Sequence, residues 1–309
     1  MGSTKTEERN PRTRGLDRKS TLEILRVLNR EDRSVAEAVR HTLPQIARAV
    51  DQIVKSMRGG GRLFYVGAGT SGRLAVLDAA EIAPTYGTSP KLVQALIAGG
   101  SKALQTAVEG AEDSATNGAR DLARARVTRR DVVVGIAASG TTPYVVGALQ
   151  WAKRRGCATV AVTSNPKSPV ARTARIAITP RTGPEAIAGS TRMKAGTSQK
   201  MVLNMLSTTS MVRFGRVYEN WMIHVGLINQ KLRRRAAIIL QEAASVDAFR
   251  AEHALRQTGH DLAAALVMLK TDATVAAAKH ALSMTGGDVR KALELHGKKR
   301  RVSVRDRGK

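Results

Sequence analysis

The sequence predicts an α/β protein in which helices cover both faces of a parallel sheet, with flanking N-terminal helices and a small all-helical domain near the C-terminus. Three observations predict this fold class. Short apolar runs alternate with helical patterns between residues 62 and 179. A glycine-rich turn follows the first run, and alanine-rich helical patterns with glycine stops fill residues 247–295. Apolar strands that alternate with helices are typical of a parallel sheet.

The N-terminal part of the chain has two different patterns. Residues 1–20 carry six basic and three acidic residues and almost no apolar ones, which predicts a tail or an extended arm. From Thr21 onward an apolar helical face begins. A second helix is expected over about residues 33–57, because apolar residues recur there at spacings near three and four.

The central part predicts a repeated strand, turn and helix. Strands are expected over residues 62–66, 92–98, 131–136, 158–163 and 174–179. Helices are expected over residues 72–81, 101–109 and 143–154, and a long helical stretch from Gly196 to about residue 242, interrupted near Phe214 and Gly215. Ligands of such sheets bind at the carboxyl ends of the strands.

These patterns predict four segments of different character. They are a basic N-terminal arm, an α/β domain with flanking helices, a small helical domain and a basic tail, over residues 1–20, 21–245, 246–295 and 296–309.

The charge balance favours an anionic partner. The chain has 51 Lys and Arg against 25 Asp and Glu, a formal charge of +26, and residues 296–309 alone contribute +6. Only nine residues are aromatic, too few for a typical base-stacking surface. Small-molecule anions are therefore favoured over nucleic acid.

Several site classes find no support. The single cysteine, Cys157, excludes a disulfide framework and predicts a reducing cytoplasm. No membrane partner is expected, because Ser139 to Pro143 interrupt the uncharged run at residues 132–152 with loop-forming residues. The six histidines show no metal-binding spacing, and His224 is expected to be a packed histidine of the long helix. Neither a metal nor a cofactor is predicted.

A glycine-rich turn follows the first expected strand. Residues 67–72 (GAGTSG) satisfy the dinucleotide fingerprint, yet no Asp or Glu lies between Glu81 and Glu109, where an acid should bind the ribose. The hydroxyls of Thr70 and Ser71 at a helix N-terminus suit a phosphate monoester better than NAD.

A second hydroxyl-rich turn follows the third expected strand. Ser139, Gly140 and Thr141 repeat the chemistry of the first turn, so the two turns could surround one phosphate. For either turn alone, hydroxyls that only cap helices explain the pattern equally well.

Two carboxylates stand out because each lies in a stretch with few charges. Glu81 lies at the expected end of its helix, which Pro84 should terminate, and Glu112 lies in residues 109–114 (EGAEDS). At about 1.5 Å per residue, a helix places Glu81 roughly 15 Å from Ser71. If both contact one ligand, Glu81 must come from a neighbouring chain or the helix must break early.

A third cluster spans residues 189–197 (GSTRMKAGT), between the sheet and the long helix. Arg192 and Lys194 could neutralise a phosphate or a carboxylate, although a cation in so basic a chain is usually solvated.

These motifs resemble one bacterial family. The stretches GAGTSGR, DAAEIAPTYG, LIAGG, VEGAEDS, DVVVGIAASGTTPY and GSTRMKAGT, which begin at residues 67, 78, 96, 108, 131 and 189, resemble the N-acetylmuramic acid 6-phosphate etherases. The resemblance covers about residues 5–295, from Thr6 to Asn10 through the helical C-terminal unit. It implies the sugar isomerase (SIS) fold, with a UBA-like domain at residues 246–295.

The resemblance also implies a reaction. Such lyases cleave the lactyl ether of N-acetylmuramic acid 6-phosphate with water, giving N-acetylglucosamine 6-phosphate and D-lactate, a step of cell-wall amino sugar recycling. It places the catalytic acid at Glu81 and a second active-site carboxylate at Glu112. Elimination needs one ionised and one protonated carboxyl group. We expect Glu81 to protonate the departing lactate oxygen, although either residue could act at C2.

An alternative belongs to another class. Glucokinase regulatory protein, a non-enzymatic sugar-phosphate sensor, shares the fold and the GAGTSGR and VEG-x-EDS motifs. The family pattern implies that such relatives lack an acid at the position of Glu81, so its presence here favours the enzyme. A homodimer with shared active sites is expected, because Glu81 is predicted to lie far from the phosphate turn.

Overall fold

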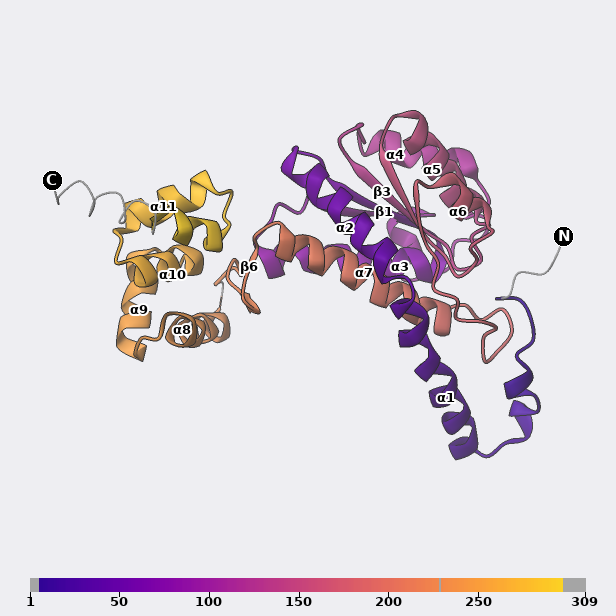
Figure 1. Cartoon of the computed structure of the whole chain (residues 1–309). Coiled ribbons are helices and arrows are strands. Elements are labelled where there is room, and N and C mark those ends of the chain that lie inside the picture. Colours follow the sequence, from indigo (N-terminus) through magenta and orange to yellow (C-terminus); the bar gives the residue numbers. More distant parts are fainter. Residues whose placement is uncertain (1–5, 228, 297–309) are drawn as a thin grey trace. The chain divides into compact units, whose positions relative to one another are not determined.

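The computed structural model describes residues 6–227 and 229–296, which belong to two compact units (Figure 1). Unit 1 contains the residues up to Glu81 together with Pro90–Ser210. Unit 2 contains Ile82–Ser89 and the residues from Met211 onward. Apart from residue 296, the expected basic tail lies outside the described residues. The chain passes from one unit to the other near residues 81, 90 and 210. The units are defined by contacts within each of them, so they do not test the predicted domain boundary at residue 245, which stays a prediction.

Unit 1 is built on a five-stranded parallel sheet, as the apolar runs predict. The strands follow the order β2-β1-β3-β4-β5. Their bounds are Leu63–Gly67 for β1, Val93–Ile97 for β2, Val132–Ile136 for β3, Ala158–Val162 for β4 and Ile176–Ile178 for β5. Every residue of β1 and β3 is buried, because helices cover both faces. The predicted fold class is confirmed.

Two layers of helices enclose this sheet (Figure 1). Helices α4 (Ala115–Arg124), α5 (Pro143–Arg154) and α6 (Pro169–Thr173) cover one face. The other face carries α2 (Leu43–Arg58), α3 (Gly69–Tyr86) and α7 (Lys194–Arg213). The bounds of α5 agree with the predicted helix at residues 143–154.

Two predicted helices need correction, one at residues 33–57 and one at residues 101–109. The second helix does not begin near residue 33, because α1 (Thr21–Arg40) continues through that point and α2 begins only at Leu43. The break lies at Thr42, whose hydroxyl donates to the Val39 carbonyl (2.7 Å), and Pro44 occupies the first turn of α2. The helix expected at residues 101–109 is a short 3-10 helix, η3 (Gly100–Leu104), followed by a loop.

Unit 2 has a helical core of its own. After α7 ends at Arg213, a short hairpin of β6 (Val217–Tyr218) and β7 (Trp221–Met222) replaces part of the expected long helix. Four helices follow, α8 (Gln230–Ala244), α9 (Ala248–Gln257), α10 (Leu262–Thr271) and α11 (Val275–Met284). Buried alanines and leucines form their shared core, as the alanine-rich pattern predicts.

His224 lies after the hairpin, outside any helix, which corrects its predicted location. Its Nε2 lies 2.8 Å from the Gly287 carbonyl oxygen. Burial above all, together with the charge of Arg216, lowers its pKa. The prediction of a packed histidine is therefore confirmed.

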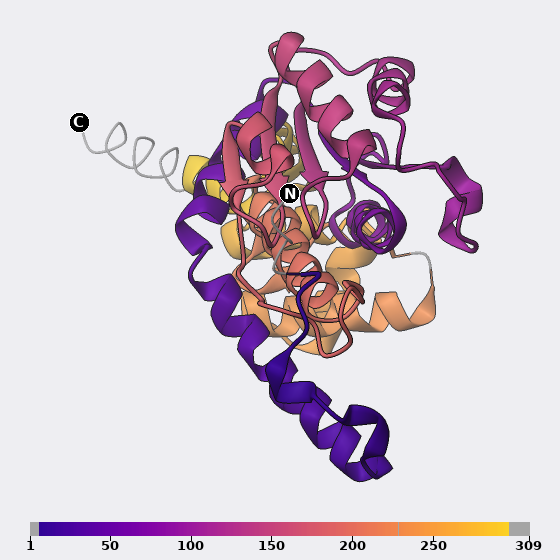
Figure 2. The same ribbon diagram turned by 90° about the vertical axis from the view of Figure 1, so that its right-hand side faces the viewer.

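From residue 6 onward the predicted N-terminal arm is ordered, whereas residues 1–5 lie outside the described residues. Residues 6–19 fold back beside α1 and contain two short 3-10 helices, η1 (Pro11–Thr13) and η2 (Leu16–Arg18) (Figure 2). The side chains of Thr6, Asn10 and Thr13 are buried. The arm is therefore part of unit 1, and its polar side chains find partners there.

Glu31 of α1 is the centre of a buried ion cluster that joins three segments of unit 1. Its carboxylate accepts hydrogen bonds from Asn10 Nδ2 (2.8 Å), Arg12 Nε (2.6 Å) and Lys194 Nζ (2.7 Å). The side chains of Glu31 and Lys194 are only 3% and 1% exposed. The hydrogen bond from Arg12, and then those from Lys194 and Asn10, lower the pKa of Glu31 to about 2 against the opposing effect of burial.

We expect Glu31→Gln to destabilise the protein by about 3–5 kcal/mol at neutral pH, because the buried Lys194 ammonium would lose its counterion. The folded-state pKa of Glu31 is lowered from 4.5 to about 2, so its stabilising effect is complete above pH 4.5 and is lost as the pH falls toward 2. Urea unfolding of both proteins across that range should therefore show a difference that shrinks with acidification.

The matched control is Glu37→Gln, on the same helix. Glu37 is exposed and pairs with Arg40 on the surface, so its removal should cost less than about 1 kcal/mol. Equal losses for the two variants would contradict a special role of the buried cluster.

Candidate active site

The order of the strands places two loops side by side at the carboxyl edge of the sheet. β1 pairs with β3 in parallel register, with Gly67 opposite Ile136. The chain therefore leaves both strands at one level. After β1 it passes through Ala68 into the first turn of α3 (residues 68–71, called the first loop below), and after β3 it enters the second loop at residues 137–142. The winding of the sheet reverses between these two strands, which is where α/β sheets bind ligands. The two hydroxyl-rich turns are neighbours, as predicted.

The first loop turns directly from β1 into α3. A Cβ on Gly67 would lie 2.8 Å from the Gly72 nitrogen, so the tight turn needs glycine there, and Gly69 has a positive φ of 51°. The first N–H groups of a helix have no partner within it, and they carry partial positive charge. At this N-terminus, Gly69, Thr70 and Ser71 line a pocket.

Ser71 is hydrogen-bonded to a side chain of α7. Its hydroxyl donates to Gln199 Oε1 at 2.9 Å, and the residue is only 8% exposed. Gln199 Nε2 is buried and has no hydrogen-bond partner among the described residues. The hydroxyl proton of Ser71 is therefore directed toward Gln199.

The second loop is locked by its own hydroxyls and by α6. Ser139 Oγ and Thr141 Oγ1 are hydrogen-bonded at 2.8 Å, and the Thr141 N–H donates to Ser139 Oγ at 3.3 Å. Gly140 has a positive φ of 74°, and its carbonyl accepts from the Val170 N–H at 3.0 Å. The loop therefore presents hydroxyls in a fixed arrangement.

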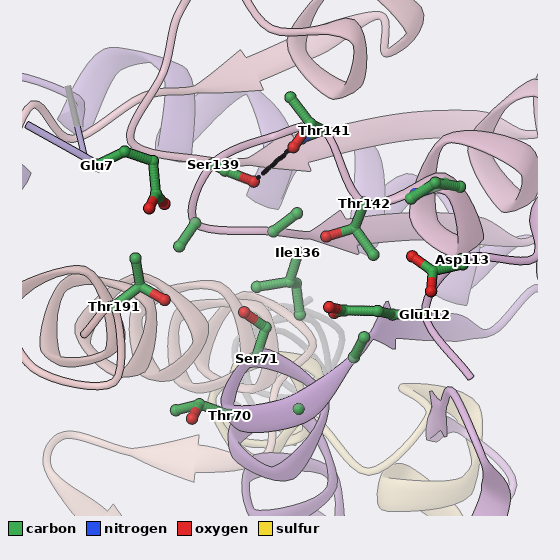
Figure 3. A pocket seen from close by; sticks show the side chains of 15 residues that line it. Glu7, Thr70, Ser71, Glu112, Asp113, Ile136, Ser139, Thr141, Thr142 and Thr191 are labelled. Atoms are coloured by element: carbon green, nitrogen blue, oxygen red, sulfur yellow. Dashed lines mark hydrogen bonds between the residues drawn. The ribbon is translucent and has the colours of Figure 1, made fainter. Parts of the chain in front are cut away.

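These loops enclose a pocket of about 370 Å³ (Figure 3). Its walls are formed by Glu7, Ala68, Gly69, Thr70, Ser71, Glu112, Asp113, Ile136, Ala137, Ala138, Ser139, Thr141, Thr142, Pro143 and Thr191. Among the described residues that line it there is no Lys or Arg. An anion here would be bound by hydroxyls and a helix N-terminus, with carboxylates close by.

Glu112 reaches the pocket from the loop before α4. Its carbonyl accepts a hydrogen bond from the Tyr144 N–H at 3.0 Å, in the first turn of α5. Ser114 then caps α4, because its hydroxyl accepts from the Asn117 N–H at 3.2 Å. Two helix N-termini thus fix the backbone on which Glu112 projects into the pocket (Figure 3).

A second pocket, of about 330 Å³, adjoins the first. Gly69, Glu112 and Asp113 line both. The second pocket also includes Arg73 and residues 107–111. A ligand larger than a phosphate therefore has room on both sides of Glu112.

The structure keeps Glu81 away from this pocket. Helix α3 continues without a break from Gly69 to Tyr86 and includes Pro84, so the predicted stop at that proline is wrong. Glu81 is exposed and does not line the pocket. An early break of α3 therefore cannot bring Glu81 to the ligand that Ser71 contacts, and a neighbouring chain is the remaining way.

The predicted phosphate residues have different places. Thr70, Ser71, Ser139 and Thr141 line the pocket, whereas Gly140 shapes its loop without lining it. The predicted substrate contacts Arg192 and Lys194 are absent from the lining, Arg192 being exposed and Lys194 paired with Glu31. Their contact with a substrate stays a prediction.

Four polar pocket residues had no role in the sequence-based site, namely Glu7, Asp113, Thr142 and Thr191. Asp113 follows Glu112 directly, Thr142 follows the second hydroxyl-rich turn, and Thr191 lies in the cluster at residues 189–197, where only the two cations were considered. Glu7 lies in the stretch from Thr6 to Asn10 that carries part of the family resemblance, which was the available signal. Periodicity could not predict that Glu7 lines one pocket with Gly69 to Ser71, which lie more than 60 residues farther along the chain.

Nothing in the described part of the chain suggests a metal or a membrane helix. Residues 6–227 and 229–296 contain no cluster of three or more His, Cys, Asp or Glu that could hold a metal ion. Within the same residues, none of the helices combines the length and apolar character needed to cross a membrane.

Comparison with known proteins supports the resemblance over most of the chain. Residues 45–153 match the glucokinase regulatory protein N-terminal SIS domain, and residues 106–209 match the SIS domain. An N-acetylmuramic acid 6-phosphate etherase of Enterobacter sp. (strain 638) is 50% identical over 294 residues, which cover 95% of this chain and 99% of that protein. The protein of the same name from Yersinia pestis (strain Pestoides F) is 54% identical over 269 residues, covering 87% and 91%.

Among solved structures, a phosphoheptose isomerase from Francisella tularensis is similar with a TM-score of 0.49 at 19% identity, covering 63% of this chain and 100% of that chain.

We expect Gly140→Ala to disrupt the pocket. Its positive φ strains any other residue, and a new Cβ would overlap the Ser168 hydroxyl. Thermal unfolding should show a loss of about 1–3 kcal/mol together with weaker binding of inorganic phosphate. Gly183→Ala is the matched control, because Gly183 has a similar φ but open space around it. Unchanged phosphate binding in Gly140→Ala would contradict the role of this loop.

Proposed function

The chain belongs to the N-acetylmuramic acid 6-phosphate etherase family, and we propose that it cleaves the D-lactyl ether of N-acetylmuramic acid 6-phosphate. Water is the second substrate, and N-acetylglucosamine 6-phosphate and D-lactate are the products. The observation that carries this proposal is 50% identity to such an etherase across almost the full length of both chains. The pocket supports it, because it combines anion-binding groups with carboxylates in one cavity.

The phosphate would bind between the two loops. Thr70 and Ser71 contribute hydroxyls and the N-terminus of α3, and Ser139 and Thr141 contribute hydroxyls from the other side. Gly140 allows this second loop its conformation. A phosphate anchored there leaves the sugar to extend toward Glu112 and the adjoining pocket.

The chemistry proceeds in two stages from the open-chain sugar. The aldehyde at C1 makes the C2 proton acidic, and a carboxylate removes it. The C3–O bond then breaks, and a carboxylic acid protonates the departing lactate oxygen, which leaves a C2=C3 double bond. Water adds its hydroxyl to C3 and a proton to C2. In our assignment Glu112 is the base and Glu81 is the acid.

A homodimer with shared sites would bring these two residues together. Glu81 lies on an unbroken helix outside the pocket of its own chain, so a partner chain must supply it if it contacts the same sugar. Leu77, one turn earlier on α3, is 54% exposed, and an interface over this face of the helix would bury it. The cytoplasmic location expected from the single cysteine belongs to this proposal too.

A second function is a sugar-phosphate sensor without catalysis. The match of residues 45–153 to the glucokinase regulatory protein SIS domain favours it. A sensor would bind the phosphosugar in the same pocket but would have no use for an acid at the position of Glu81. Turnover therefore distinguishes the two.

Incubation with N-acetylmuramic acid 6-phosphate should release D-lactate, which a D-lactate dehydrogenase assay measures. Glu81→Gln should still bind N-acetylglucosamine 6-phosphate but lose at least about 100-fold in lactate release, because an amide cannot protonate the leaving oxygen. Phosphosugar binding without any lactate release by the wild type would favour the sensor. Unchanged turnover of Glu81→Gln would remove this residue from the mechanism.

Mixed dimers test whether sites are shared. A Glu81→Ala chain and a chain with both Ser139→Ala and Thr141→Ala should each be inactive. Random mixing should restore about one quarter of wild-type activity, since half of the dimers are mixed and each has one intact site. No recovery in dimers shown to be mixed would contradict sharing.

A further inference from the structure

Glu7 is a carboxylate of the pocket that the proposed chemistry does not use. It lines the same cavity as Ser71, Glu112 and Ser139 although it belongs to the N-terminal arm. In the view of Figure 3, Glu7 and Thr191 lie on one side of the pocket and Glu112 lies on the other. The arm therefore completes one wall of the cavity.

The arm is fixed on both sides of Glu7. Thr6 and Asn10 are only 2% and 4% exposed. The Thr6 carbonyl accepts a hydrogen bond from the Gly189 N–H at 3.4 Å, and Asn10 Nδ2 donates to the Pro184 carbonyl at 3.3 Å. Glu7 is thus held against the segment that leads to Thr191.

Close packing adds a second constraint on this side chain. Gly189 has a positive φ of 76°, and a Cβ there would lie 3.2 Å from Glu7 Oε2. The absence of a side chain at Gly189 leaves this space to the carboxylate. Farther along the arm, Thr13 Oγ1 donates to the Ala186 carbonyl at 2.8 Å, and Arg12 and Asn10 bind Glu31.

The buried ion cluster extends this support to the pocket wall. Lys194, which binds Glu31, is the first residue of α7, and its N–H and that of Ala195 donate to Glu185 (2.9 Å each). The segment from Glu185 to Lys194 is therefore anchored at both ends. The segment that Glu7 approaches at Gly189 is therefore tied to the core at Glu185 and Lys194.

The chemistry of a carboxylate limits what Glu7 can bind. An ionised carboxylate only accepts hydrogen bonds, so its partner must be a donor. A phosphate or a second carboxylate would be repelled, whereas sugar hydroxyls and an amide N–H are donors. No Lys or Arg among the described lining residues is available to neutralise Glu7 within the pocket.

We propose that Glu7 binds the sugar of the substrate by accepting hydrogen bonds from its hydroxyl or amide N–H groups. This inference rests on the proposed function for the identity of the sugar. Glu7 would then orient the hexose relative to the phosphate loops and select N-acetylated or hydroxylated phosphosugars over simple phosphates.

Direct binding measurements test this without relying on turnover. Glu7→Gln should weaken N-acetylglucosamine 6-phosphate roughly tenfold, the effect of one hydrogen bond to a charged group. Its affinity for inorganic phosphate, which the loops alone would bind, should be unchanged or higher. Glu8→Gln is the matched control, because Glu8 is exposed like Glu7 but does not line the pocket. Equal affinity of wild type and Glu7→Gln for the phosphosugar would overturn the proposal.

Glucose 6-phosphate separates the two kinds of donor. If sugar hydroxyls bind Glu7, the Glu7→Gln variant should bind both phosphosugars more weakly than the wild type does. If the amide N–H binds Glu7, only the affinity for the N-acetylated phosphosugar should fall. Equal weakening of phosphosugar and inorganic phosphate would overturn the proposal, because it indicates general damage to the pocket. An unchanged melting temperature of Glu7→Gln would show that the substitution does not damage the fold. Glu7→Asp, which keeps the carboxylate, should recover part of the phosphosugar affinity.

Kinetics then connect Glu7 to the proposed reaction. With N-acetylmuramic acid 6-phosphate, Glu7→Gln should raise KM about tenfold and change kcat less. A wild type that releases no D-lactate would contradict the proposed function but leave the binding result intact. An unchanged KM in an active enzyme would contradict only the role of Glu7.

Discussion

The parallel pairing of β1 with β3 is the constraint on which the candidate site depends. It brings two loops to one edge of the sheet although about 70 residues of chain separate them. Each loop alone is a common way to begin a helix. Together they enclose a cavity in which hydroxyls and a helix N-terminus can hold an anion. Because the strands are fully buried, this relation between the loops is rigid.

The positive charge of the chain has little part in the pocket. The formal charge is +26, yet no Lys or Arg is among the described lining residues. Lys194, a cation next to the pocket wall, is used for structure, because Glu31 neutralises it in the interior. The same ion cluster secures the N-terminal arm and so connects folding to the shape of the site. An anion bound by hydroxyls and a helix N-terminus leaves nearby carboxylates free to act. In a lysine-rich pocket those carboxylates would form ion pairs with the lysines.

Helix geometry explains why one predicted carboxylate is in the pocket and the other is not. Glu112 lies on a loop that two helix N-termini hold beside the first loop. Glu81 lies three turns along α3, and a straight helix carries it roughly 15 Å away. The proline expected to end this helix is accommodated within its last turn. The proposed shared sites follow from this separation.

The sequence alone determined the strands, the α/β class, the two hydroxyl-rich turns and the family, because apolar periodicity, glycine position and motif identity are local properties. The sequence-based predictions of the break between α1 and α2 and of the end of α3 were wrong. Whether a hydroxyl ends a helix, or a proline is accommodated within one, depends on the residues packed around it. Only the tertiary structure decided that Glu7 lines the pocket and that Lys194 is buried on Glu31. Both facts depend on contacts between segments far apart in the chain, which local patterns do not encode.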